Sequence, residues 1–224
     1  MHSLQPIRRP IARRRWPAAG AFAFPCTPEK EPAAEPALWL AAVSPATVIL
    51  DAAPPGCTGI TPRKIAEWPI IVADRLLSDG RHLVLSDVDG FHHLWIRDTL
   101  LRQPLAYVIV RDAAAETRRQ AASRLDRRLA GAPPSRHIGA SRPTGYQRRR
   151  LNRLLDILDI MGTADGPLTS YDIAQRLIYP DLKIGRGIDW KSSSERRHAM
   201  RLIGQARRLA NGGYRDLLRG IVRG

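Results

Sequence analysis

Cysteine is scarce in this chain of 224 residues, which contains only Cys26 and Cys57. Two isolated cysteines supply neither a disulfide framework nor the paired spacing of a zinc site, and their scarcity is typical of a reducing compartment. Long apolar runs are absent as well, because none approaches the length of about 18 residues that spans a membrane. We therefore expect a cytoplasmic protein that makes no membrane contact.

Catalytic and metal-binding motifs are also missing. No glycine-rich loop follows a strand where it could hold a phosphate, and no nucleophile stands in a recognisable pattern with a base. His92 and His93 are adjacent in an expected strand and so point to opposite faces. No cysteine or acid lies at ligand spacing from this pair or from His82. The sequence predicts no enzymatic activity, no cofactor and no metal site.

Acidic residues are scarce at both ends of the chain, which carries a formal net charge of +15. Residues 1–15 contain five arginines and no acid, whereas residues 16–135 contain 13 basic and 13 acidic side chains. Residues 136–224 contain 18 basic and 8 acidic side chains, a net charge of +10. A basic patch beside a neutral body is typical of proteins that bind a polyanion such as nucleic acid.

Composition divides the chain into four segments. Residues 1–36 form a basic arm and a Pro-rich linker; a solvated leader, an arm that touches phosphate and an export signal are the alternatives for the arm. Residues 37–130 are expected to form a sheet-containing module. Residues 131–145 are rich in Pro, Gly and Ser and indicate a second linker. Residues 146–224 have the pattern of a helical DNA-binding domain.

The 37–130 segment has the pattern of an antiparallel sheet. Short apolar runs that indicate strands lie at 38–43, 46–50, 82–86, 91–96 and 105–110. The tetrapeptide DVDG at 87–90 separates the third run from the fourth and predicts a hairpin turn. Residues 65–77 fit either a strand or a helix. A helix at 113–130, with Asp112 as its cap and Gly131 at its end, is expected to cover the sheet.

Three amphipathic helices are predicted after residue 145. The first, at 146–161, places four leucines on one face, namely Leu151, Leu154, Leu155 and Leu158. The second begins at Thr169, which forms a capping box with Asp172, and ends at Pro180. A long loop then leads to the third. We interpret the set as a helix-turn-helix with a long turn, the alternative being a three-helix bundle whose charged face is only solvated or binds a protein.

The third helix, at 192–210, is the most informative stretch of the chain. At about 100° per residue, its apolar side chains form one stripe and its arginines lie on the opposite side. After Glu195 in the first turn, no acid follows until Asp216. A solvated face normally mixes charges of both signs, so this helix is expected to pack one side into a core and to offer the other to DNA.

Ten residues are candidates for DNA contact. In the third helix, Arg201 lies midway along the arginine stripe and Gly204 would let the DNA backbone approach, although a helix-packing glycine or one fixed by drift is an equal alternative. The arginines of the first helix would hold phosphates and position the protein without reading bases. The full set is Arg196, Arg197, Arg201, Gly204, Arg208, Arg148, Arg149, Arg150, Arg153 and Lys191.

Five stretches together resemble a known family. They are HLVLSDVDGFHHLWI, RLNRLLDILDIMG, SYDIAQRL, the tryptophan at position 190 and RRHAMRLIGQARRLANGGYRDLL. The resemblance is to a proteobacterial domain, formerly of unknown function and now described as a helix-turn-helix variant. It occurs in transcription factors for type VI secretion and in activators and antiactivators of integrative and conjugative element transfer. The resemblance covers roughly residues 38–219, and it implies sequence-specific DNA binding by the C-terminal helices and oligomerisation or partner contact through other surfaces.

The sequence therefore predicts an α+β protein: an N-terminal antiparallel-sheet module with a covering helix, followed by a three-helix helix-turn-helix variant. We expect a sequence-specific transcriptional regulator whose partners are double-stranded DNA, further copies of itself and another transcription regulator. The alternative is an antiactivator that binds a partner regulator instead of DNA, because some short members of the family act in that way. Neither the sign of regulation nor the operator follows from the sequence.

Overall fold

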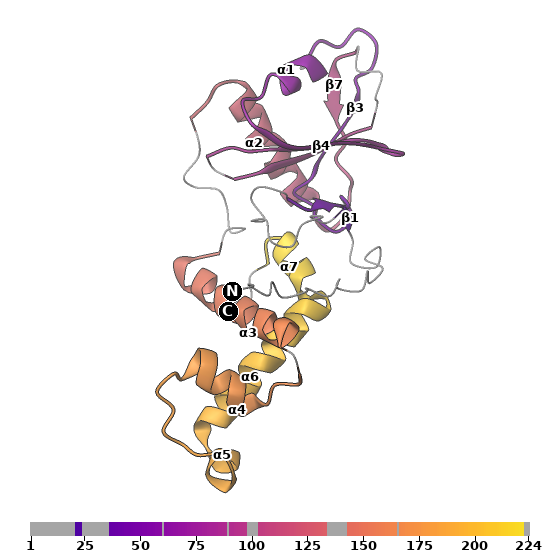
Figure 1. Cartoon of the computed structure of the whole chain (residues 1–224). Coiled ribbons are helices and arrows are strands. Elements are labelled where there is room, and N and C mark those ends of the chain that lie inside the picture. The colour runs from indigo at the N-terminus through magenta and orange to yellow at the C-terminus, as the bar shows by residue number, and fades with distance from the viewer. Residues whose placement is uncertain are drawn as a thin grey trace, which may run out of the picture.

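The computed structural model describes residues 21–23, 36–59, 61–88, 90–97, 103–133, 143–164 and 166–221. The basic arm and most of the Pro-rich linker expected at 1–36 lie outside the described residues, as does most of the linker expected at 131–145. Figure 1 shows a sheet module in the upper part of the molecule and a group of helices below it. The fold class α+β is thus confirmed.

The sheet module is built on a five-stranded sheet with the order β4-β5-β6-β3-β7. Its strands are β3 (Val48–Ala52), β4 (Ile71–Leu77), β5 (Gly80–Leu85), β6 (His92–Ile96) and β7 (Leu105–Tyr107). The predicted hairpin is confirmed, because β5 and β6 pair antiparallel across the DVDG turn. The ambiguous 65–77 stretch contains both the end of a short helix, α1 (Pro62–Ala66), and strand β4. A separate antiparallel ribbon joins β1 (Ala21–Ala23) to β2 (Leu38–Trp39).

The sheet is mixed, which corrects the expectation of a purely antiparallel one. Strands β3 and β6 are parallel, with Val48 opposite Leu94 and Leu50 opposite Ile96. After β3 the chain passes through α1 and the β4–β5 hairpin before it returns as β6, and such a crossover allows two strands to run in the same direction. Pairing between strands so far apart in the sequence leaves no local pattern.

Helix α2 (Ala115–Leu129) covers one face of this sheet, as predicted. Alternate strand residues point toward it, because side chains of a strand alternate between the two faces. Asp112 accepts a hydrogen bond from the Ala114 amide at 2.9 Å, close to its expected capping role. The buried core between sheet and helices consists of Val48, Leu50, Ile65, Leu83, Leu85, Leu94, Ile96, Ala121, Ala122 and Leu125.

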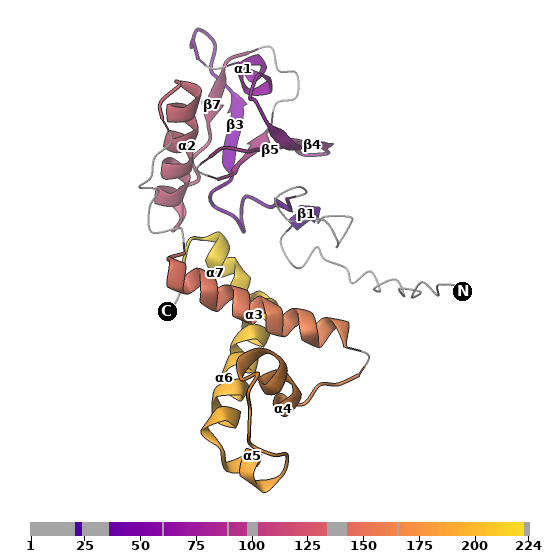
Figure 2. The same cartoon turned by 60° about the vertical axis from the view of Figure 1, so that its left-hand side comes forward.

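The helical region follows residue 143. It comprises α3 (Gly145–Thr163), α4 (Ser170–Ile173), the π-helical turn η2 (Ala174–Ile178), α5 (Ile188–Ser192), α6 (Ser194–Arg208), the π-helical turn η3 (Leu209–Gly213) and α7 (Tyr214–Leu218). Figure 2 shows α3 crossing α6, with α4 beside them and α5 at the end farthest from the sheet. The predicted capping box of Thr169 and Asp172 is present, and Thr144 forms a second one with Gln147.

Helix α3 buries most of the predicted leucine face but not Leu155, since Leu154 and Leu158 join the helical core. Leu154 and Ile157 are buried, whereas Leu155 is 50% exposed. Ile157 packs in one cluster with Leu202 and Ile203 of α6, and the position of that helix leaves no mark on the local leucine pattern. The stripe is therefore rotated toward Ile157 and Ile160.

The predicted stop after the arginine helix is a kink rather than an end. Gly212 has φ of 124°, in the region that favours glycine, and the chain then continues as α7. Tyr214, the first residue of α7, contacts Trp39 of the sheet module, with 5.8 Å between ring centroids. The arginine helix is thus linked through one kink to the sheet module. No helix in the described ranges is long and apolar enough to cross a membrane.

Candidate nucleic-acid interface

Helix α6 begins where its serines can cap it. The Ser193 hydroxyl accepts a hydrogen bond from the Arg196 amide at 3.0 Å. In the first turn, the side chain of Glu195 accepts hydrogen bonds from its own backbone amide and from Ser194, and both lower its pKa. The positive pole of the helix dipole also stabilises a carboxylate at this end. The helix therefore starts two residues later than predicted, at Ser194, with the predicted acidic first turn.

One side of α6 is buried in the helical core. Ala199 and Ala206 are fully buried, and Leu202 and Ile203 are 7% and 4% exposed. Leu202, Ile203 and Ala206 pack in a cluster with residues of α3 and α4, including Ile157 and Ile173. This is the apolar stripe that the sequence predicts. Its burial fixes which way the rest of the helix faces.

The opposite side of α6 carries exposed arginines. Arg197, Arg201, Arg207 and Arg208 are exposed, and Arg196 is half-buried. None of these five forms an ion pair with a carboxylate of the described residues. Arg196 and Arg197 instead donate to the backbone carbonyls of Lys191 and Ser192, at 3.2 and 3.1 Å. Glu195 interacts with Arg197 only at longer range, so most of the positive charge on this face stays unpaired.

Gly204 lies within this face. A Cβ atom built on it would meet Arg208 Nη1 at 3.6 Å, an ordinary contact. Close packing inside the protein therefore does not require a glycine at this position. The observation weakens the packing alternative and leaves two: a glycine without a role, and a glycine that lets an external backbone approach.

Helix α3 brings the other arginines close to α6. Arg150 is half-buried and donates from Nη2 to Oε1 of Gln205 in α6 at 3.1 Å. Arg148, Arg149 and Arg153 are exposed on α3. Arg150 thus joins the two helices, which distinguishes it from its three exposed neighbours. Gln205 is a contact that the sequence did not indicate, because the pair is 55 residues apart.

The long connection before α6 is held in place by aromatic and charged contacts. Arg186 donates to Asp172 at 2.5 Å and its guanidinium lies 5.0 Å from the centre of the Tyr171 ring. Trp190, on the unpredicted helix α5, is buried and meets Tyr171 edge-on at 5.2 Å. Lys191 is exposed on the same short helix. The expected loop therefore has a defined structure that positions Lys191 beside the start of α6.

A further pair anchors α6 from the side. The hydroxyl of Tyr179, at the end of η2, lies 2.6 Å from Nδ1 of His198. The rings of the two residues are 5.9 Å apart and steeply inclined. Sequence reasoning did not identify this contact. The only sign in the sequence is the spacing, which puts His198 one helical turn before Arg201, a candidate for DNA contact.

Comparison with known families assigns both parts of the chain. Residues 108–219, half of the chain, match the family described as "T6SS, Transcription factor, DNA binding domain". Residues 46–107 match a domain of unknown function, DUF7012. No curated protein and no solved structure matches the chain. The link to integrative and conjugative elements stays a prediction.

The border between the two matches does not coincide with the border between the two cores. It falls directly after Tyr107, the last residue of β7, so α2 lies in the second match. In the structure, however, α2 packs on the sheet through Ala121, Ala122 and Leu125. A helix of the DNA-binding family region therefore completes the core of the preceding module.

Proposed function

The chain belongs to the T6SS (type VI secretion) transcription-factor DNA-binding domain family, and from this premise we propose that it is a sequence-specific transcriptional regulator that reads double-stranded DNA with α6. The observation that carries the proposal is the two-sided character of this helix. Ala199 and Ala206 are buried on one side, while Arg197 and Arg201 are exposed on the other without carboxylate partners among the described residues. A helix held in this way presents its positive charge outward to a polyanion.

In this proposal α4, η2 and α6 form a helix-turn-helix variant, with α5 inside an extended turn. The residues in the N-terminal half of a recognition helix usually reach the base edges, and an arginine there can bind guanine through two hydrogen bonds. We assign base contact to Arg197 and Arg201, and to Arg208 farther along. Gly204 lies between them and would allow close approach of the DNA backbone.

Phosphate contacts are assigned to the basic residues that flank α6. They position the protein on the duplex without specifying a sequence. Arg150 would act partly through α6, because it also donates to Gln205. The assigned residues are Arg148, Arg149, Arg150, Arg153, Arg196 and Lys191.

We further propose that the protein is not an enzyme, acts in the cytoplasm and forms a homo-oligomer. The second candidate function is an antiactivator that binds a partner regulator. Exposed apolar side chains in the helical region favour it, since Ile188 is 81% exposed and Leu155 and Met200 about half exposed. Such side chains are unusual on a surface that binds only phosphates.

Selection of bound fragments from a random DNA pool by the purified chain tests the proposal. We expect enrichment of a defined sequence, and affinity for it that falls steeply with salt. Neutralisation of about six phosphates gives a log–log slope near −5. An affinity that does not change between low and moderate salt would reject DNA binding and support the antiactivator.

A further inference from the structure

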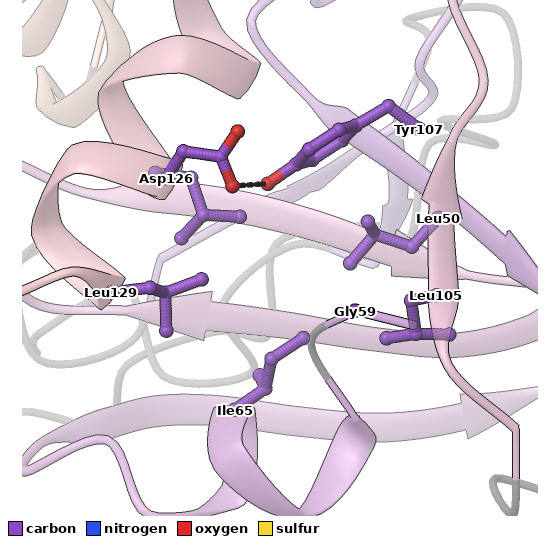
Figure 3. A pocket seen from close by; sticks show the side chains of 8 residues that line it. Leu50, Gly59, Ile65, Leu105, Tyr107, Asp126 and Leu129 are labelled. Atoms are coloured by element: carbon purple, nitrogen blue, oxygen red, sulfur yellow. Dashed lines mark hydrogen bonds between the residues drawn. The ribbon is translucent and has the colours of Figure 1, made fainter. Parts of the chain in front are cut away.

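A cavity of about 210 Å³ opens in the sheet module, between the sheet and helices α1 and α2. Its walls come from two pairs of neighbouring elements that are distant from each other in the sequence, β3 with α1 and β7 with α2. Figure 3 shows their side chains around an open space. The residues that line it include Leu50, Ile65, Leu105, Tyr107, Asp126 and Leu129.

The walls are apolar except on one side. Leu50 and Ile65 belong to the buried core, and Leu105 and Leu129 are half-buried against it. On the remaining side, the Tyr107 hydroxyl donates to Oδ1 of Asp126 at 2.5 Å. Small-molecule sites commonly combine an apolar body with a few polar groups of this kind. One side of the cavity is therefore polar and the rest apolar, which would orient a ligand that has a single polar end.

The polar pair offers acceptors to a ligand. Burial and the hydrogen bond to Asp126 raise the pKa of Tyr107 above its ordinary value, so its hydroxyl stays protonated and donates to the carboxylate. No arginine or lysine of the described residues forms an ion pair with Asp126. Asp126 is solvent-exposed at the edge of the cavity, so its charge is available to a cation that enters there, and the hydroxyl oxygen of Tyr107 can accept a hydrogen bond.

We propose that this cavity binds a small apolar amine, with the hydrocarbon body between Leu50, Leu105 and Leu129 and the ammonium group at Asp126. A dry cavity of about 150 Å³ holds one benzene molecule, so the volume here suits about eight or nine non-hydrogen atoms. A single aromatic ring with a short aminoalkyl chain fits this size. An acid of the same shape would meet the carboxylate with like charge.

The position of the cavity gives the ligand contact with both matched segments of the chain. Tyr107 ends the first match and Asp126 lies in the second. A bound amine would therefore tie β7 to α2 across the border between them. The proposal does not rest on DNA binding, because ligand binding is measured without DNA.

Calorimetric titration of the full chain with three probes of matched shape tests the proposal. The probes are 2-phenylethylamine, 2-phenylethanol and phenylacetate. We expect the amine to bind about three- to fivefold more tightly than the alcohol, because a charged donor binds a carboxylate more strongly than a neutral one and Asp126 is partly screened by solvent. Phenylacetate should not bind. Equal binding of all three probes, or no binding of the amine at millimolar concentration, would overturn the proposal.

Two variants locate the binding in the cavity. Asp126→Asn should weaken amine binding about three- to fivefold and leave the alcohol unchanged, since only the charge is lost. Leu129→Phe should weaken both probes by filling the space. Asp156→Asn, which changes an exposed carboxylate of α3, is the matched control and should have no effect. Amine binding that survives both cavity variants would place it elsewhere and overturn the assignment.

Discussion

Arginine serves two different purposes in the two regions of this molecule. In the sheet module, arginines pair with nearby carboxylates, as in Arg81–Asp74 at 2.6 Å and Arg118–Asp112 at 2.9 Å. In the helical region, Arg197, Arg201 and Arg208 are exposed and have no such partner among the described residues. The first set neutralises charge within the protein, and the second leaves its charge free to act on something outside.

The comparison teaches that basic residues indicate a binding surface only where acids are missing. The 16–135 segment has as many basic as acidic side chains, and several of its described arginines pair with them, as Arg81, Arg118 and Arg128 do. The 136–224 segment has ten more basic than acidic side chains. A count of arginines alone would not distinguish the two. Four predictions test this division between paired and unpaired arginines, in order from the largest expected effect to the smallest.

The largest effect is expected at Asp87, whose side chain is 4% exposed. Its carboxylate accepts two hydrogen bonds from Arg128, at 2.6 and 3.0 Å, and lies 3.3 Å from His92. Burial alone would raise the pKa of Asp87, but hydrogen bonds from Arg128, the Val88 amide and His92 hold it below its ordinary value. Asp87→Asn should lower the free energy of unfolding by about 3 kcal/mol, measured by urea denaturation.

The matched control for this variant is Asp74→Asn. Asp74 also pairs with an arginine, Arg81, but on the surface, where the two side chains are 42% and 29% exposed. Surface pairs contribute little, so the loss should stay below about 1 kcal/mol. Similar losses for the two variants would show that the buried Arg128–Asp87 pair stabilises the sheet module no more than the exposed Arg81–Asp74 pair does.

The second effect depends on pH and is expected in the sheet module. Burial, with Arg124 and His92 nearby, lowers the pKa of His93 from 6.5 to about 4. The folded state thus disfavours the charged imidazole, so this contribution to stability is complete above pH 6.5 and is lost as the pH falls from 6.5 to 4. The shift corresponds to at most about 3 kcal/mol.

Urea denaturation of the wild type and His93→Gln at several pH values between 7 and 4 tests this effect. Glutamine cannot take up the proton, so the variant should lose less stability over that range. Between pH 7 and 8, the contribution of His93 to the free energy of unfolding of the wild type should hardly change. If the variant loses stability as steeply as the wild type, another group is responsible for the acid sensitivity.

The third effect is on DNA binding and separates the two uses of arginine directly. Arg201→Ala should cost about 1–3 kcal/mol of binding free energy on the selected sequence and relax preference at one position. Arg149→Ala should weaken all sequences alike and reduce the salt slope by about one. Arg119, which pairs with Glu116 on α2 at 2.8 Å, is the control from the sheet module.

Competition binding on specific and scrambled duplexes measures these differences. Arg119→Ala should leave affinity for both duplexes unchanged. Equal losses on both duplexes for Arg201→Ala would mean that α6 holds only the DNA backbone. Loss of DNA affinity in Arg119→Ala would contradict the division between the two regions.

Local chemistry made much of this structure predictable from the sequence. The DVDG hairpin, helix α2, the Thr169 capping box and the two faces of α6 depend on residues that lie near one another in the chain. The parallel pairing of β3 with β6, the burial of Trp190 on α5 and the pairing of Arg128 with Asp87 depend on distant partners. The predicted place of Leu155 on the apolar face is wrong for the same reason, because the packing of α6 determines which face of α3 is buried.

The smallest effect is expected at Gly204, where folding and binding favour different residues. Alanine forms helix more readily than glycine by about 1 kcal/mol, and its Cβ would make only an ordinary contact with Arg208. Gly204→Ala should therefore raise the free energy of unfolding by up to about 1 kcal/mol. If the DNA backbone approaches this point, the same methyl group should lower affinity for the selected sequence by about fivefold, or 1 kcal/mol.

Gly162→Ala in α3 is the matched control for this variant. Gly162 is exposed, and a Cβ built on it would meet nothing within 4 Å. It should add some helix stability without changing DNA affinity. A Gly204→Ala protein that is more stable and still binds DNA with full affinity would remove Gly204 from the interface. A more stable protein with weakened DNA binding would instead place the glycine where an external backbone, and not the protein's own packing, requires it.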